Sequence, residues 1–224
     1  CAPPGTQATC HHGTVTQELL KEGFHRDLLV KVELGAMGED AGGCSVAARI
    51  HLPPGIYVDP YELASLQQHN VTKAVLVPDV IDVEAPEYSA TDLLVLLYLE
   101  PDPRCSGCFR AALPVHGRYH RPAEDSEEAS VVLKSPKVLI CCCDSRLEAE
   151  CWPPAAMEAP CSGKAVGSCQ WHSIMHTPVY EELILQVPVG LRQHSSFVCV
   201  LTLLATVLCC SLIIAAVCRY GHFS

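Results

Sequence analysis

Short apolar runs separated by turn residues fill roughly the first 190 positions of the chain. In residues 28–34, Leu-Leu-Val-Lys-Val-Glu-Leu, apolar and charged side chains alternate, which is typical of a strand with one buried face. Similar β-branched or leucine-rich runs occupy residues 71–77, 80–83, 93–99, 109–115, 131–133, 138–142 and 180–187. Many short strands joined by Pro, Gly and Asp predict a mainly β domain with an antiparallel β-sandwich-like fold.

One segment in this part carries the signals of a helix start. Asp59 precedes Pro60; an aspartate side chain accepts hydrogen bonds from the free amides of a first turn, and proline fits the first helical position. We expect one or two helical turns within residues 58–66, packed on the sheet. Because the chain has 17 prolines, longer helices are not expected in this part.

The longest apolar run lies near the C-terminus. From Phe197 to Val217 there are 21 residues without a charge, and 12 of them are Leu, Ile, Val or Phe. A helix of this length reaches about 31 Å, which matches the hydrocarbon core of a bilayer. At about −0.3 to −0.6 kcal/mol for each of those side chains, insertion is favoured by roughly 4 to 7 kcal/mol. The run predicts one transmembrane helix in contact with the lipid bilayer.

Composition narrows the class of protein further. Of the 15 cysteines, 11 precede the apolar run, and this density is typical of oxidising compartments, where disulfides persist. Because 11 is odd, we expect at least one unpaired thiol, and the pairings cannot be read from the sequence. The formal net charge is −10. A surface this acidic repels phosphate backbones, so nucleic acid is excluded as a partner.

The count of basic residues does not orient the chain, because Arg192 and Arg219 flank the apolar run on opposite sides. Two other observations do. The sequence begins at Cys1 rather than Met, which we interpret as a secretory signal that is absent or removed. Asn70-Val71-Thr72 is an N-glycosylation sequon, and Asn70 is the only asparagine. With the cysteines, these features predict a single-pass type I protein whose N-terminal domain is lumenal. We expect a disordered lead-in at 1–15, a lumenal β-rich domain at 16–190, a juxtamembrane linker at 191–196, the transmembrane helix at 197–217 and a cytosolic tail at 218–224.

Cys105-Ser106-Gly107-Cys108 has the spacing of a thiol–disulfide redox pair. Such a pair needs its first cysteine at a helix N-terminus, where the helix dipole stabilises the thiolate. Cys105 and Cys108 lie between two strand-like runs instead. We therefore interpret them as a loop disulfide, or as two cysteines that pair elsewhere.

Other candidate chemistry is equally sparse. His116 and His120 would share one face of a strand but lie about 13 Å apart. No acidic or cysteine ligand stands at a clear spacing from them. We therefore interpret them as hydrogen-bonded or surface histidines rather than metal ligands. The acidic run Glu124–Glu128 is interpreted as a solvated loop. The chain has no Asp-x-Asp, nucleophile elbow, phosphate-binding glycine loop or zinc-protease helix. We therefore expect no catalytic residues, cofactor or metal.

Several long and unusual motifs resemble a known family. They are residues 22–29 (Glu-Gly-Phe-His-Arg-Asp-Leu-Leu), 55–66 (Gly-Ile-Tyr-Val-Asp-Pro-Tyr-Glu-Leu-Ala-Ser-Leu), 113–122 (Leu-Pro-Val-His-Gly-Arg-Tyr-His-Arg-Pro), 185–191 (Leu-Gln-Val-Pro-Val-Gly-Leu) and the final Arg-Tyr-Gly-His-Phe-Ser. From about Glu18 to the C-terminus the chain resembles the phosphatidylinositol-glycan biosynthesis class X family (PIG-X).

The resemblance implies a non-catalytic subunit that stabilises glycosylphosphatidylinositol (GPI) mannosyltransferase I in the endoplasmic reticulum membrane. It also implies that the catalytic carboxylates lie on a multi-spanning partner, the class M subunit (PIG-M). That enzyme transfers the first mannose from dolichol-phosphate-mannose to glucosaminyl-(acyl)phosphatidylinositol. A domain joined to the membrane helix by a linker of about 25 Å at most suits this role, because it stays beside the bilayer.

Two other classes of function remain open on the residues alone. A cell-surface receptor or adhesion ectodomain suits the strands, the sequon and the cysteines equally well, although the short tail after the membrane helix offers no signalling motif. A lumenal thiol oxidoreductase is the other class, and it would use Cys105 and Cys108.

Overall fold

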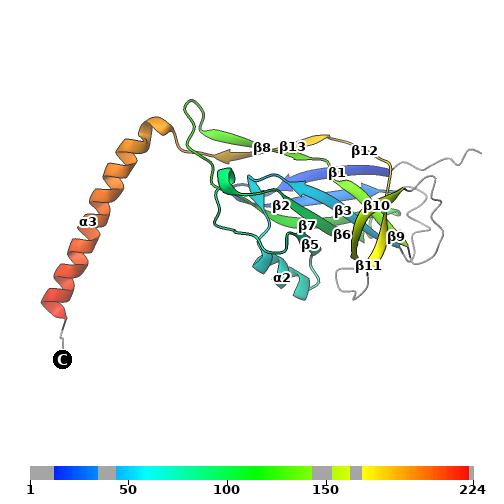
Figure 1. Cartoon of the computed structure of the whole chain (residues 1–224), viewed down its shortest axis with the longest axis horizontal. Coiled ribbons are helices and arrows are strands. Elements are labelled where there is room, and N and C mark those ends of the chain that lie inside the picture. The colour runs from blue at the N-terminus through cyan, green and yellow to red at the C-terminus, as the bar shows by residue number, and fades with distance from the viewer. Residues whose placement is uncertain (1–12, 35–43, 143–152, 162–167, 222–224) are drawn as a thin grey trace, which may run out of the picture. The chain divides into compact units, whose positions relative to one another are not determined.

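The computed structural model describes residues 13–34, 44–142, 153–161 and 168–221 (Figure 1). The strands are β1 (Gly13–Leu20), β2 (His25–Glu33), β3 (Cys44–Leu52), β4 (Ile56–Tyr57), β5 (Lys73–Val77), β6 (Leu93–Pro101), β7 (Cys108–Gly117), β8 (Glu128–Lys134), β9 (Lys137–Cys142), β10 (Pro154–Pro160), β11 (Ser168–Ser173), β12 (His176–Pro178) and β13 (Glu182–Pro188). The helices are α2 (Pro60–Gln68), α3 (Ser195–Tyr220) and the short 3-10 turns η1 (Glu87–Ser89) and η2 (Arg192–His194).

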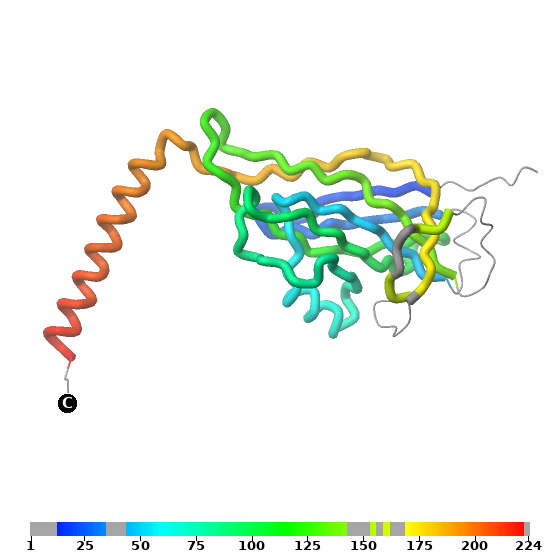
Figure 2. The backbone as a smooth tube through the Cα atoms, in the orientation of Figure 1, coloured from blue at the N-terminus to red at the C-terminus, as the bar shows by residue number. Residues whose placement is uncertain are grey.

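Two halves of one curled sheet enclose the core of the domain (Figure 2). One half has the strand order β7-β2-β1-β12, and the other has the order β10-β11-β9-β3-β6. The halves join at a single corner, where Glu100 and Pro101 of β6 pair with Arg110 and Phe109 of β7. Among the described residues, the strand pairs of this larger sheet are antiparallel except β1 with β12. The predicted mainly β, sandwich-like fold is confirmed.

The main core forms between these halves because their strands alternate buried and exposed side chains. Val30 of β2 and Leu113 of β7 belong to the same buried cluster as Ile50 of β3 and Val95 of β6. A separate two-stranded sheet, β8 with β13, adds its own alternating face to this cluster. Its inward residues are Val131, Leu133, Leu185 and Val187. The two-stranded sheet therefore covers the core rather than extending the larger sheet.

A second, smaller core lies on the opposite face of β6, and Trp171 of β11 is at its centre. Trp171 is fully buried, and its indole N–H donates to the carbonyl of Ala159 at 3.4 Å. The Tyr98 ring lies 6.0 Å away, and its hydroxyl donates to the carbonyl of Pro160 at 2.8 Å. Burial raises the pKa of Tyr98 to about 12, because the tyrosinate anion would lose its hydration there. This cluster fastens β10 and β11 onto the central strands.

Helix α2 follows the predicted signals. The Asp59 carboxylate accepts from the amides of Tyr61 at 2.8 Å and Glu62 at 3.5 Å, and Pro60 is the first helical residue. Leu63 is the buried residue of the helix, and the helix lies beside β5 (Figure 1). The helix start was predictable because its cap is local in sequence.

The strand predicted at residues 80–83 is wrong, because this segment is a loop. The Asp82 carboxylate turns back to accept from the amides of Glu84 and Ala85, at 3.0 and 3.2 Å. The carbonyls of Asp82 and Val83 accept from the Arg118 guanidinium. With these groups engaged by Arg118 and by the turn itself, residues 80–83 pair with no strand in the described part of the chain. At the other boundary, β1 begins at Gly13, within the range expected to be a lead-in, whose residues 1–12 lie outside the described part.

Three disulfides are present among the described residues. Cys44–Cys142 joins β3 to β9, Cys161–Cys169 closes the β10–β11 hairpin, and Cys105–Cys108 closes the turn between β6 and β7. The Cys105–Cys108 turn contains Gly107 at φ 72° and does not lie at a helix N-terminus. The loop-disulfide interpretation is confirmed for this pair.

Helix α3 contains the predicted apolar run and is long and apolar enough to cross a membrane. Its 26 residues reach about 39 Å, and none is buried within the chain. The hydroxyls of Thr202, Thr206 and Ser211 donate to the carbonyls four residues before them, at 2.7 to 2.8 Å. These bonds satisfy the polar side chains inside the helix, as an apolar solvent requires.

The segment before α3 forms a compact unit with residues 121–129. The amide of Ala123 donates to Gly190 at 3.0 Å, and the amide of Arg192 donates to Ala123 at 2.8 Å. The Arg192 guanidinium also pairs with Glu124 at 3.0 Å, although both side chains are largely exposed and the pair is worth little. Backbone hydrogen bonds thus hold the segment before α3 against residues 121–129.

We predict that Trp171→Ala lowers the free energy of unfolding by about 3 to 5 kcal/mol, because it removes the largest side chain of the second core and leaves a cavity. Tyr180→Ala is the control: Tyr180 is 63% exposed, so its loss should change stability by about 0.5 kcal/mol or less. Urea unfolding of the full chain in detergent, with limited proteolysis as the readout, measures the free energy of unfolding of both variants. Equal losses in the two variants would contradict the packing described here.

A second prediction compares two disulfides by the length of chain they enclose. Cys44 and Cys142 are 98 residues apart, whereas Cys105 and Cys108 are three apart. From loop-closure entropy, replacing the first pair by serine should lower the free energy of unfolding by about 4 to 5 kcal/mol and replacing the second by about 2 kcal/mol. The measurement is denaturant unfolding without reductant. A larger loss for the Cys105–Cys108 variant would contradict this ranking.

Candidate functional site

Three segments that are far apart in the sequence meet at one end of the domain. His25, the first residue of β2, lies directly opposite His116, near the end of β7, in the antiparallel register. Tyr57 of β4 pairs with His116 on the other edge of β7. Glu62 reaches the same place from the first turn of α2. Each segment belongs to one of the motifs that carry the family resemblance.

The side chains of His25, Glu62 and His116 converge on one point. The Nε2 atom of His116 lies 2.8 Å from Oε2 of Glu62, within hydrogen-bond distance. The Nε2 atom of His25 lies 3.6 Å from the other carboxylate oxygen, Oε1. The two imidazole rings meet edge to face, with centroids 4.4 Å apart. Both oxygens of one carboxylate therefore face an imidazole nitrogen.

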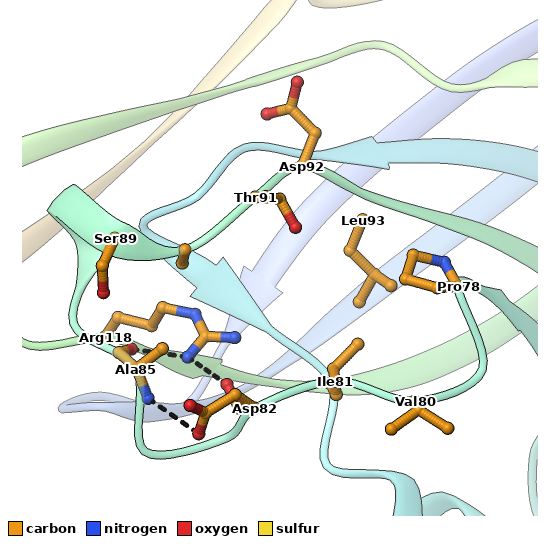
Figure 3. Close-up of a pocket in the computed structure, with 11 residues that line it drawn as sticks. Pro78, Val80, Ile81, Asp82, Ala85, Ser89, Thr91, Asp92, Leu93 and Arg118 are labelled. Atoms are coloured by element: carbon orange, nitrogen blue, oxygen red, sulfur yellow. Dashed lines mark hydrogen bonds between the residues drawn. The ribbon is translucent and has the colours of Figure 1, made fainter.

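Arg118 supports this end of the domain through the Tyr57 ring. Its guanidinium lies over the Tyr57 ring, 4.6 Å from the ring centroid, and the Tyr57 ring stacks in turn on His116 at 5.2 Å. One terminal nitrogen, Nη1, donates to the carbonyls of Asp82 and Ala85, at 2.8 and 2.6 Å (Figure 3). Arg118 is 6% exposed, and burial lowers the pKa of its guanidinium. The arginine thus holds the loop at residues 78–92 against the sheet.

A hollow of about 350 Å³ lies beside this loop. Its lining includes Pro78, Ile81 and Leu93 together with two carboxylates (Figure 3). Both carboxylates are engaged elsewhere: Asp82 accepts from two backbone amides, and Asp92 lies 3.4 Å from Nε2 of His51. The two carboxylates that line the hollow are therefore not free to act together as a pair.

The structure separates His116 from His120. Strand β7 ends at Gly117, and the His120 side chain lies near Glu87, with 3.9 Å between Nδ1 and Oε2. His116 lies beside Glu62, whereas His120 lies near Glu87, so the two histidines have different carboxylate neighbours. The acidic run at residues 124–128 is exposed, as a solvated loop should be, and Glu124 pairs with Arg192.

Asn70 lies in the exposed turn directly after α2. Its φ of 56° is in the left-handed region, which asparagine tolerates better than most residues. The third sequon residue, Thr72, is buried, and its hydroxyl donates to the carbonyl of Ala112 at 2.9 Å. The amide side chain of the candidate acceptor is thus on the surface of the folded domain.

Sequence reasoning missed the grouping of His25, Glu62 and His116. Local spacing could not find it, because the two histidines are 91 positions apart and the glutamate is on a helix between them. The available signal was that each residue stands in a different family-like motif. Long motifs that fold to one place can be read as parts of one site.

Comparison with known proteins places the chain in a family. The sequence model of the PIG-X / PBN1 family matches residues 21–218. A human protein named GPI alpha-1,4-mannosyltransferase I, stabilizing subunit, is 47% identical over 98% of this chain and 85% of its own length. Mouse and rat proteins of the same name are 44% and 46% identical, over 100% and 98% of this chain and 88% and 87% of their own lengths.

These matches cover both the β domain and the apolar helix α3, so they concern the whole architecture described above rather than one motif. They agree with the resemblance carried by the motifs that meet around His116. The chain belongs to the PIG-X / PBN1 family.

Proposed function

We propose that this chain is the non-catalytic stabilising subunit of GPI alpha-1,4-mannosyltransferase I. One observation carries the proposal: the relatives that bear this name are 44–47% identical to the chain over nearly all of its length. The role needs a folded domain and a membrane anchor on one polypeptide. Both lie within the matched region.

The proposed partner is the multi-spanning catalytic subunit, PIG-M, on which the catalytic carboxylates lie. A subunit that binds only the folded enzyme draws its folding equilibrium away from the unfolded form; at a concentration of 100 times Kd this is worth about 2.7 kcal/mol. Helix α3 supports such contact, since Ala205, Ser211, Ala215 and Ala216 are small enough for a neighbouring helix to approach closely.

The proposed location is the endoplasmic reticulum membrane, with a single-pass type I orientation and the β domain in the lumen. The three disulfides support a lumenal domain, because disulfides persist in oxidising compartments. The proposed divisions are a lumenal domain at residues 16–190, a linker at 191–196, a membrane helix at 197–217 and a cytosolic tail at 218–224. The backbone bonds between residues 121–129 and the linker support a short connection to the membrane.

We predict that deleting the gene in cells lowers the level of the catalytic subunit several-fold and removes GPI-anchored proteins from the cell surface. The physical reason is that the unassembled enzyme is more often unfolded and is degraded. Pulse-chase of the catalytic subunit and surface labelling of GPI-anchored proteins measure the two effects. Unchanged half-life and unchanged surface labelling would contradict the proposal.

A rescue variant separates this proposal from a thiol oxidoreductase. The double variant C105S/C108S removes the turn disulfide but leaves the core intact, so it should restore the catalytic subunit and the surface proteins as well as the unchanged chain does. Failure of this variant, while it folds and reaches the membrane, would favour redox chemistry.

We further propose that Asn70 carries an N-linked glycan, since its side chain is exposed and stands in the sequon Asn70-Val71-Thr72. The prediction is a single step in gel mobility after endoglycosidase treatment of the full chain from cells. Asn70→Gln should abolish the step, whereas Gln67→Asn, which creates no sequon, should keep it. A chain that never shifts, although it is membrane-bound, would count against a glycan at this position.

A further inference from the structure

Three side chains, those of His25, Glu62 and His116, converge on one point, whereas a hydrogen bond involves only two. The His116–Glu62 contact of 2.8 Å accounts for two of the three side chains. The third, His25, brings its Nε2 to 3.6 Å from the second carboxylate oxygen, too far for a good hydrogen bond. All three ligand atoms lie within 4.8 Å of one another. We propose that these three residues bind a Zn²⁺ ion.

The spacing fits the coordination that zinc prefers. Zinc binds imidazole nitrogen and carboxylate oxygen at about 2.0 to 2.2 Å in tetrahedral geometry, which sets neighbouring ligand atoms roughly 3.3 Å apart. The Nε2 atoms of His116 and His25 lie 2.8 and 3.6 Å from the two different oxygens of Glu62, on either side of this value, and one ligand atom from each residue lies within 4.8 Å of the others. Binding of the ion would draw the two nitrogens and one carboxylate oxygen to tetrahedral separations.

The backbone holds all three ligands on regular secondary structure. His25 and His116 are register partners on adjacent strands, so their Cα atoms are fixed by the β2–β7 ladder. Glu62 is in the first turn of a helix that Asp59 caps. Tyr57 stacks on the His116 ring, and Arg118 stacks on Tyr57. The ligands are therefore largely pre-organised, which lowers the entropy lost on binding a metal ion.

The surroundings leave the ion accessible from one side. The side chains of His116, Glu62 and His25 are 19%, 32% and 45% exposed, so His116 is the most buried of the three and His25 the most exposed. Three protein ligands leave the fourth tetrahedral position for water or for a group from another molecule. The net charge of the chain, −10, also favours a cation. A bound ion would tie α2 to β2 and β7.

The test uses the purified full chain in detergent, without reductant, after EDTA treatment and dialysis. Calorimetric titration with ZnCl₂ should give one tight site per chain, with a Kd in the micromolar range or below. His25→Ala and His116→Ala should each weaken binding at least tenfold. The matched control is His51→Ala: His51 lies in the same domain beside Asp92 and should keep the affinity of the unchanged chain.

Glu62→Gln separates a metal ligand from a hydrogen-bonding residue. Glutamine keeps the size of the side chain and an oxygen that accepts from His116, so the variant should fold and melt like the metal-free chain. It loses the carboxylate, so zinc affinity should fall at least tenfold. Zinc should raise the melting temperature of the unchanged chain but not that of this variant.

Co²⁺ supplies an independent readout, since tetrahedral cobalt absorbs visible light strongly. The bands should appear with the unchanged chain and be absent from His116→Ala. Two results would overturn the proposal: no zinc binding by the unchanged chain at micromolar concentrations, or zinc binding that Glu62→Gln and His116→Ala leave at full strength.

Discussion

The exposed apolar surface of helix α3, which is long and apolar enough to cross a membrane, is the constraint on which the proposed role depends. Its 26 residues are all exposed, and between Arg192 and Arg219 there is no charged residue. Its hydroxyl groups bond back to the helix itself. Water would leave this apolar surface unburied, whereas a bilayer buries it at a gain of several kcal/mol. The backbone bonds between residues 121–129 and 188–192 lead directly into this helix.

The proposed role also determines what the β domain must do. The domain does not need to supply a catalytic centre for its proposed role; it needs to persist beside the membrane as a stable partner. Two buried clusters, one on each face of β6, and the Cys44–Cys142 disulfide provide that stability. The formal net charge of −10 opposes binding of the chain to anionic surfaces.

Features governed by local chemistry were predictable from the sequence. The start of α2 follows from Asp59 and Pro60, and β2, β6 and β9 follow from their apolar runs. Residues 80–83 show the limit of this reasoning, because a carboxylate turn and a distant arginine take up the backbone groups that a strand would use. Strand β3 contains the segment Ala47-Ala48-Arg49, whose weak β propensity hides it from pattern reading.

The candidate site was not predictable in the same way, because it depends on strand register. His116 has His120 as its neighbour in sequence, yet its neighbours in space are His25 and Glu62. A shift of one residue in the β2–β7 pairing would turn His25 to the opposite face of the sheet. Only the assembled fold brings the three side chains together, and only the fold shows that Arg118 supports them through Tyr57.

The most direct test of the account is extraction of cell membranes with alkaline carbonate, which releases proteins held by other proteins or by charge but not those that cross the bilayer. We predict that the full chain stays in the membrane pellet, and that a chain ending before Ser195 moves to the supernatant. Release of the full chain into the supernatant would contradict the membrane helix, and with it the proposed place of the domain beside a membrane enzyme.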